Sequence, residues 1–259
     1  MNWPGNTRPS HLIASAEVLS SPTLAVTIRC FMVELVLFDI DGTLVRTGGA
    51  GIEAFRKVFA AEFRATDGFE RLKFAGRTDT GLVREFFKYH QIPMTRENTG
   101  RFFEHYVFLL DYILSQGAPR PCEGVLDFLA GLNALPAPPL VGLLTGNIRL
   151  GAEIKLRHCK LWEPFKMGAF ADDSEDRNLI AAAARDRGSR LLGKALRGDQ
   201  IVVIGDTAHD VRCGRHIGAK VLAVATGGAT LDELKSHQPD WAVENLSRVT
   251  AREIVLSQS

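Results

Sequence analysis

A short apolar run that ends in two carboxylates constrains this chain more than any other feature. Residues 35–38 read LVLF, and Asp39 and Asp41 follow at once, before Gly42 and Thr43. A run this short, rich in valine and leucine and closed by turn residues, is typical of a strand buried on both faces of a parallel sheet. The carboxylates are therefore expected at the carboxyl end of the strand, where open α/β sheets bind their ligands.

Two carboxylates so close together predict a metal-binding or catalytic role rather than a purely structural one. Burying one of them is costly, and burying both requires a cation or a hydrogen-bonded proton nearby. The oxygen ligands suit a hard cation such as Mg²⁺. The same pair suits catalysis, with Asp39 as a nucleophile and Asp41, two residues further on, as a general acid and base.

A second strand is predicted over residues 140–144, and it ends in Thr145, Gly146 and Asn147. A hydroxyl beside free backbone donors at the start of a helix can hold a phosphate group. The alternative is an ordinary helix cap by Thr145 or Asn147, which is a frequent use of both residue types.

A third strand, over residues 201–204, is followed by Asp206 and Asp210. A purely structural role is not expected for Asp206. For Asp210 the alternative is a carboxylate that complements the dipole at the first turn of a helix. His209 lies between them, and its position predicts an exposed histidine at a helix start.

These motifs together resemble those of the haloacid dehalogenase superfamily, in its phosphatase branch. DIDGT at residues 39–43 resembles the first motif, TGN at 145–147 the second and GDTAHD at 205–210 the fourth. Dehalogenase members lack an Asp at the second position, so Asp41 favours phosphoryl transfer. The resemblance runs from residue 32 to the C-terminus. It implies an α/β fold, with a three-layer Rossmann-like core, a mainly parallel sheet and an inserted α-helical cap domain.

The resemblance also implies roles for the motif residues. Asp39 would take up the phosphoryl group as an aspartyl-phosphate. Asp41, protonated in an apolar site, would give its proton to the leaving oxygen and then activate water. Mg²⁺ would be held by Asp39, Asp206 and the backbone carbonyl of Asp41, with Asp210 supporting the site. The phosphoryl oxygens would be bound by Thr145, Gly146 and Asn147.

The third motif departs from the family pattern. The family places a Lys near a helix start upstream of the last acidic motif, and this chain has Arg177 there, after an acidic run at residues 172–176. Arginine keeps the charge but differs from lysine in shape and donor geometry. Two hypotheses follow, in which either Arg177 takes the role or Lys155 reaches in from the preceding helix. Sequence position favours Arg177.

Between the first two motifs, residues 49–121 predict the helical cap, and residues 32–48 and 122–259 predict the core. Aromatic stripes at helical spacing, which include Phe55, Phe59 and Tyr106, predict the core of a helical bundle. The loop at residues 74–81 offers Arg77 and Thr78 as substrate contacts by family resemblance. The alternatives are a solvated charge for Arg77 and a helix cap for Thr78 or Asp79, the cap being favoured for Asp79.

The remaining features argue against a nucleic-acid-binding, a membrane-spanning or a secreted protein. The net charge of +1 gives no sign of a nucleic-acid partner, and no apolar stretch is long enough to span a bilayer. The four cysteines are far apart and predict reduced thiols in a cytoplasmic protein. Residues 1–31 show no signal-peptide pattern. They are interpreted as a dispensable extension, with Met32 as an alternative start.

The sequence therefore predicts a Mg²⁺-dependent phosphomonoesterase, similar to phosphoglycolate phosphatase, that hydrolyses a small-molecule phosphate ester. A phosphotransferase similar to β-phosphoglucomutase is the alternative, because it shares the fold and the motifs. A phosphate-binding protein without turnover is a third possibility, suggested only by Arg177. The substrate and the oligomeric state stay open.

Overall fold

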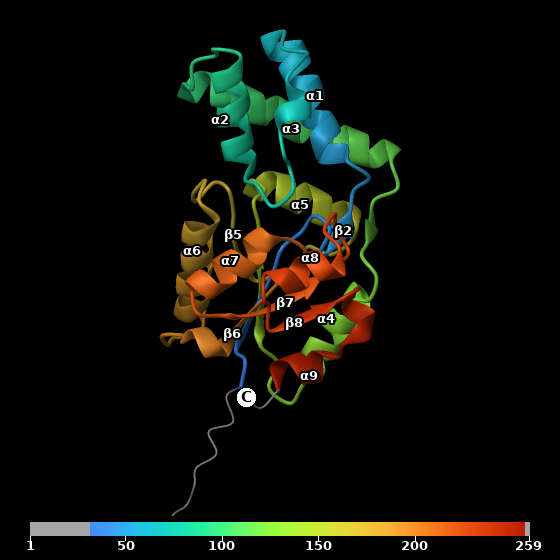
Figure 1. The fold of residues 1–259 in the computed structure, drawn as a ribbon, viewed down its shortest axis with the longest axis vertical. Helices are drawn as coiled ribbons and strands as arrows, with labels where there is room; N and C mark the ends of the chain where they lie inside the picture. The colour runs from blue at the N-terminus through green and yellow to red at the C-terminus, as the bar shows by residue number, and fades with distance from the viewer. Residues whose placement is uncertain (1–31, 257–259) are drawn as a thin grey trace, which may run out of the picture.

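A six-stranded parallel sheet organises the protein, which we describe over residues 32–256 of a computed structural model (Figure 1). The extension interpreted at residues 1–31 lies outside the described residues. The strands, in spatial order, are β5 (Met167–Ala169), β4 (Leu140–Leu144), β1 (Leu35–Phe38), β6 (Ile201–Gly205), β7 (Lys220–Val224) and β8 (Trp241–Val243).

The central strand β1 has apolar side chains on both faces, which is why it can lie inside the molecule. Leu35 and Leu37 belong to one hydrophobic cluster, and Val36 and Phe38 belong to another on the opposite face. Alternation across a strand directs successive side chains to opposite sides. The predicted doubly buried strand is thus confirmed.

Helices cover both faces of the sheet and complete the three predicted layers. Helices α4 (Val125–Asn133), α5 (Arg149–His158) and α9 (Ala251–Val255) contribute to the cluster that holds Phe38. Helices α6 (Arg177–Leu191), α7 (Ala208–His216) and α8 (Leu231–Ser236) contribute to the cluster that holds Leu37. A 3₁₀ turn, Leu246–Arg248, precedes α9.

A helical unit lies above this core in Figure 1 and has a hydrophobic cluster of its own. It consists of α1 (Ala50–Phe63), a 3₁₀ turn (Phe69–Arg71), α2 (Asp79–Tyr89) and α3 (Arg96–Gln116). The predicted aromatic stripes supply its interior, where Phe55 packs edge-on against Phe102 and Tyr106 with ring centroids 5.0 and 4.7 Å away. This unit is the cap of the predicted fold class. The limits 49–121 remain a prediction.

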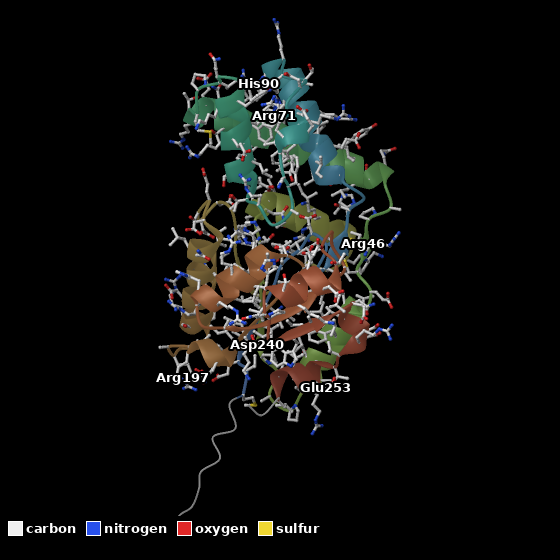
Figure 2. The ribbon with its side chains drawn as sticks, viewed as in Figure 1. Arg46, Arg71, His90, Arg197, Asp240 and Glu253 are labelled. Carbon is white, nitrogen blue, oxygen red and sulfur yellow. The ribbon has the colours of Figure 1, made fainter. Side chains whose placement is uncertain are left out.

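Two short strands connect the cap to the core. β2 (Val45–Arg46) and β3 (Arg120–Pro121) pair antiparallel, so the chain leaves and returns at the same place. Arg46, labelled in Figure 2, donates from Nη2 to the carbonyl oxygen of Thr226 at 2.8 Å and ties this connection to the loop after β7. Within residues 32–256, no helix combines the length and the apolar character that a membrane span requires.

Candidate active site

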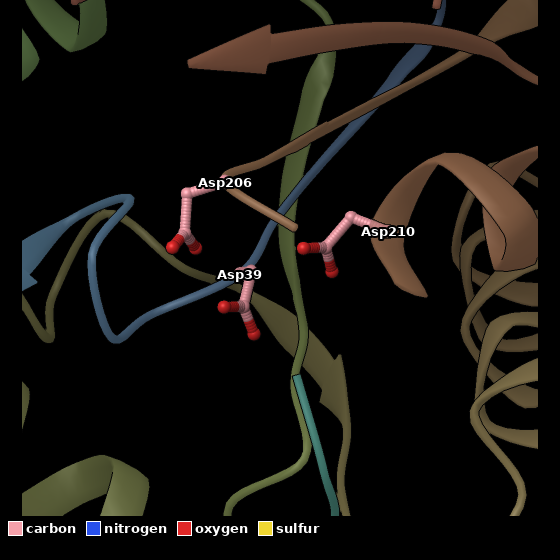
Figure 3. Close-up of side chains that lie close together, drawn as sticks. All are labelled: Asp39, Asp206 and Asp210. Carbon is pink, nitrogen blue, oxygen red and sulfur yellow. The ribbon is translucent and has the colours of Figure 1, made fainter. Parts of the chain in front are cut away.

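Three carboxylates meet at the carboxyl end of the sheet. Asp39 follows β1, Asp206 follows β6, and Asp210 lies in the first turn of α7. One oxygen from each lies within 4.8 Å of the others, and Figure 3 shows the three side chains gathered in one place. The parallel register produces this meeting, since Phe38 is paired with Ile204 and both strands end together. Asp210 thus belongs to the same cluster of carboxylates as Asp39 and Asp206.

Two glycines leave space for the carboxylate of Asp206, and one hydroxyl donates to it. Gly42 has a left-handed φ of 82°, and a Cβ there would lie 2.5 Å from Asp206 Oδ2. A Cβ at Gly227 would overlap the same carboxylate oxygen. Thr43, which sequence reasoning did not single out as a site residue, donates from Oγ1 to Asp206 Oδ1 at 3.0 Å. Its place in the first motif was the available signal.

The cluster carries more negative charge than the protein neutralises. Burial and then the neighbouring Asp210 raise the pKa of Asp39 to about 7, although Arg177 opposes the shift. Burial and then Asp39 raise the pKa of Asp206 well above its usual range. The cluster thus has three buried carboxylates and one guanidinium, which contacts two of them. Such an oxygen-rich, under-neutralised site fits a hard divalent cation such as Mg²⁺.

Arg177 supplies that guanidinium from the first turn of α6, where Asp176 caps the helix. Nη1 donates to Asp39 Oδ1 at 3.4 Å, and Nη2 donates to Asp210. Burial alone would lower the pKa of Arg177, but Asp210 and Asp39 raise it overall. The side chain is 7% exposed. Its position beside the proposed nucleophile agrees with the first of the two hypotheses for the third motif.

Lys155 also enters the site, but it contacts a different carboxylate. Its Nζ donates to Asp41 Oδ2 at 2.6 Å and to Asn147 Oδ1 at 2.5 Å, and the side chain is 4% exposed. The two cations therefore do not compete for one place. Arg177 neighbours Asp39, whereas Lys155 neighbours Asp41.

The surroundings of Asp41 differ from the apolar site that we expected. Its side chain is 42% exposed and forms the ion pair with Lys155. Asn147 Nδ2 adds a second donor at 2.9 Å from Asp41 Oδ2. The expectation was wrong because the helix after the second motif brings a buried ammonium group to this carboxylate, which the spacing of the motif could not reveal.

The second motif, which is predicted to bind phosphate, contacts Asp41 through Asn147. Thr145 is fully buried, and its Oγ1 accepts from Asn147 Nδ2 at 2.9 Å. Helix α5 begins at Arg149, and the residue in its cap position is Ile148, whose side chain makes no cap hydrogen bond. Thr145 and Asn147 are thus not the ordinary caps of this helix, and both side chains are engaged within the site.

The cap loop packs directly on the second motif. Thr78 caps α2 by accepting from the backbone N of Gly81 at 3.3 Å, as one prediction had it. The favoured prediction for Asp79 was wrong, because its Oδ2 accepts from the backbone N of Ile148 at 2.8 Å, ahead of α5. Arg77 forms an ion pair with Glu85 at 2.7 Å and is one-third exposed, so it is neither fully solvated nor buried.

His209 is half-buried rather than exposed as predicted. Its ring lies under the cap loop, where a Cβ on Gly76 would come within 2.7 Å of His209 Cδ2. Burial, and then Arg212, lower the pKa of the imidazole. The cap loop was far away in sequence, so a helix-start position alone could not predict this cover.

A cavity of about 390 Å³ lies between the cap and the strand ends. From the core it is lined by the motif residues Asp39, Asp41, Thr145, Gly146, Asn147, Lys155, Arg177 and Asp206. From the cap it is lined by Arg77 and Asp79, and by Tyr106, which we had predicted only as an apolar core residue. Thr78 and Asp210 do not line it. The geometry brings the predicted phosphoryl site and part of the cap loop into one enclosure.

A family model for haloacid dehalogenase-like hydrolases matches residues 36–224. The chain belongs to that family. This span includes all the motif residues, together with the helices of the cap, so the family resemblance inferred from the motifs is confirmed.

Curated relatives cover most of the chain at low identity. The protein named "Probable phosphatase IndB" from Dickeya dadantii is 25% identical over 222 residues, which is 84% of this chain and 92% of the relative. The pyrophosphatase PpaX from Anoxybacillus flavithermus is 24% identical over 219 residues, which is 83% of this chain and 94% of the relative.

Solved structures share the fold. One is described as a predicted phosphoglycolate phosphatase from Haemophilus somnus, with a TM-score of 0.66 and 17% identity. The match covers 87% of this chain and 98% of that chain. At this identity the likeness shows the fold alone, which agrees with the core and the cap described above.

Proposed function

We propose that this haloacid dehalogenase-like hydrolase is a Mg²⁺-dependent phosphomonoesterase that hydrolyses a small organic phosphate through an aspartyl-phosphate on Asp39. Its membership of the family, and its phosphatase relatives, make it a hydrolase of phosphate esters. The observation that carries the finer proposal is the meeting of Asp39, Asp206 and Asp210 with Arg177 at one strand end.

The metal site follows from the donor set. Asp39, Asp206 and the backbone carbonyl of Asp41 would hold Mg²⁺, with Asp210 beside them and Thr43 fixing the orientation of Asp206. Mg²⁺ bound there would reduce the repulsion between the anionic nucleophile and the anionic phosphate. The raised pKa values of Asp39 and Asp206 support this site, since both carboxylates gain from a cation.

The first chemical step is assigned to Asp39 and Asp41. A carboxylate oxygen of Asp39 attacks phosphorus as the bond from phosphorus to the ester oxygen breaks. Asp41, which is partly exposed and whose Oδ2 is held by Lys155 and Asn147, would take up a proton from solvent on Oδ1 before this step and give it to the leaving oxygen. Thr145 and Arg177 would bind the phosphoryl oxygens while charge shifts among them. Arg177 would neutralise both the nucleophile and the phosphate.

The second step returns Asp39 to its free form. Asp41 takes a proton from water, the water oxygen bonds to phosphorus, and the bond between phosphorus and Asp39 breaks. Lys155 and Asn147 hold Asp41 Oδ2 from two sides, at 2.6 and 2.9 Å, so they would orient it for both proton transfers. The cap over the cavity would limit access of bulk water and select the alcohol.

We also propose a cytoplasmic setting. Cys122, Cys159 and Cys213 are free thiols, and the first and last of them are buried. Free cysteines are usual where thiols are kept reduced. Fractionation of the cells that make the protein, followed by detection with an antibody, tests the setting.

The function is tested by phosphate release from a panel of small phosphomonoesters, with Mg²⁺ and with EDTA. Release that requires Mg²⁺ is expected. A parallel assay supplies a sugar phosphate with a sugar bisphosphate activator and analyses the products by NMR. Isomerised sugar phosphate without net phosphate release would replace the hydrolase with a mutase. Binding of phosphate without turnover of any ester would leave only the phosphate-binding protein.

A further inference from the structure

The cap side of the cavity is mostly apolar. Its walls there include Ile52 and Phe55 from α1, Phe74 from the cap loop and Leu82 from α2. Phe55 and Leu82 are each 2% exposed and belong to the packed interior of the cap, whereas Ile52 is 47% exposed and presents an apolar side chain at the surface. A surface of this kind binds the carbon skeleton of a ligand by excluding water from it.

The cations that line the cavity already have carboxylate partners. Within residues 32–256 the lining contains three: Arg177 with Asp39 and Asp210, Lys155 with Asp41 at 2.6 Å, and Arg77 with Glu85 at 2.7 Å. The lining also holds a fourth carboxylate, Asp79. An ester with a second anionic group would need a further cation, since burying an unpaired charge costs several kcal/mol.

One polar group on the cap side lacks a partner. The hydroxyl of Tyr106 is fully buried and makes no hydrogen bond to any residue of the described chain. Buried hydroxyls are normally hydrogen-bonded, so an exception calls for an unrepresented partner. Burial, and then Asp79, raise the pKa of this hydroxyl, so it stays protonated and can donate.

Two glycines pack near this hydroxyl, one from the cap and one from the core. A Cβ at Gly51 of α1 would lie 3.7 Å from Tyr106 Oη and 3.5 Å from Lys155 Nζ. A Cβ at Gly151 of α5 would also lie 3.7 Å from Tyr106 Oη. The hydroxyl is therefore placed between the cap and the core, on the side of the cavity that holds the ion pair of Lys155 with Asp41.

The size of the cavity suits a small alcohol. Its volume of about 390 Å³ lies near the lower end of the range for ligand pockets, roughly 300–1,000 Å³. A phosphate ester whose alcohol is about the size of a single ring is therefore a suitable ligand.

We infer that the enzyme prefers phosphate esters of an uncharged, ring-sized alcohol with an apolar face and one hydrogen-bonding oxygen, which Tyr106 recognises. This deepens the proposed function and rests on it. Esters whose leaving group carries a carboxylate or a second phosphate are the disfavoured class, because no lining cation of the described chain is left for them.

A matched pair of esters tests the inference. 4-(Hydroxymethyl)phenyl phosphate and 4-carboxyphenyl phosphate have nearly the same size and differ in charge, and phenyl phosphate lacks the polar substituent. We expect kcat/KM for the hydroxymethyl ester to exceed that for the carboxylate ester at least about tenfold. Tyr106→Phe should lower kcat/KM for the hydroxymethyl ester by about 3- to 10-fold and leave phenyl phosphate unchanged.

A control variant and the alternative outcomes distinguish the proposed phosphatase function from the proposed substrate preference. Tyr112→Phe, at an exposed position of the same helix, should change neither ester. A preference for the carboxylate ester or for phosphoglycolate would overturn the inference while leaving a phosphatase. An equal loss for both aromatic esters in Tyr106→Phe would overturn the recognition role. If wild type turns over no ester, the proposed function fails, and calorimetric binding of the two esters with Mg²⁺ still decides the preference.

Discussion

The two sides of the cavity are built on opposite principles. On the sheet side, Asp39, Asp206 and Asp210 are buried charges, and Arg177 holds two of them. On the cap side, apolar walls surround Tyr106, whose hydroxyl has no partner in the described chain. The charged side chains on the sheet side are thus suited to bind a phosphoryl group and a cation. The apolar surface on the cap side is suited to bind the alcohol of the substrate. The proposed sites of reaction and of substrate recognition therefore lie on different sides of the cavity.

The largest effect is expected on the sheet side. Asp39→Asn removes the proposed nucleophile, so phosphate release should fall at least about 1,000-fold. The variant should also be more stable than wild type at pH 8 without Mg²⁺, because a carboxylate crowded by burial and by Asp210 is lost. Steady-state assays and urea unfolding measure the two quantities. Asp186→Asn, at an exposed carboxylate of α6, is the matched control.

Undiminished turnover in Asp39→Asn would place the nucleophile elsewhere. A loss of turnover together with a loss of stability would instead indicate a general defect in folding. Only the combination of lower activity and higher stability supports a functional carboxylate held at a cost in free energy.

The next effect concerns the cations of the site. Arg177→Ala leaves Asp210 buried without its guanidinium, which should cost about 3–5 kcal/mol of stability and at least about 100-fold in turnover. Arg185→Ala, further along the same helix, removes an exposed ion pair and should change stability by less than about 0.5 kcal/mol. Lys155→Ala should reduce turnover less, since it removes a partner of Asp41 rather than of Asp39. Retained turnover in Arg177→Ala with abolished turnover in Lys155→Ala would reverse the assignment.

An intermediate effect is expected for the pH dependence of stability, through Asp79 at the boundary between the two sides of the cavity. Burial raises the pKa of Asp79 from 3.8 to about 7, despite the opposing influence of Lys155 and the backbone N–H of Ile148. Between these values the native state binds more protons than the unfolded state, so stability falls as pH rises from about 4 to 7. The contribution of Asp79 has an upper bound of about 4 kcal/mol.

Asp79→Asn should reduce this decline, because asparagine keeps an acceptor for Ile148 and has no charge to bury. Urea unfolding at pH 4, 5.5, 7 and 8 in EDTA measures the slope, with Asp186→Asn as the control that keeps the wild-type curve. Parallel curves for wild type and Asp79→Asn would show that Asp79 is ionised throughout this range.

The smallest effect lies on the cap side. Tyr106→Phe removes a buried hydroxyl that has no partner in the described chain, so the free enzyme should gain about 1 kcal/mol. The unfolding midpoint should then rise by roughly 2–4 °C in calorimetry. Tyr112→Phe, at 57% exposure on the same helix, should leave it unchanged. A lower midpoint for Tyr106→Phe would mean that the hydroxyl is satisfied in the free protein, and the contrast between the two sides would weaken.

Local patterns in the sequence were sufficient for the strands and for the residues at their ends. The LVLF run and the later apolar runs each became a strand of the parallel sheet, and the polar residues after them became the sheet side of the cavity. These predictions worked because a strand buried on both faces must be continuously apolar. The order of the strands was not predicted, since spacing along the chain does not fix it.

The sequence by itself indicated the reaction class, because the order of its motifs resembles that of the family whose model matches residues 36–224. Tertiary structure alone decided which cation meets which carboxylate, that His209 is covered by the cap loop, and that Tyr106 lines a cavity. Lys155 and Asp41 are 114 residues apart, and Arg177 and Asp39 are 138 apart. Such contacts depend on how the cap and the helices pack against the sheet, and no short stretch of sequence records that packing.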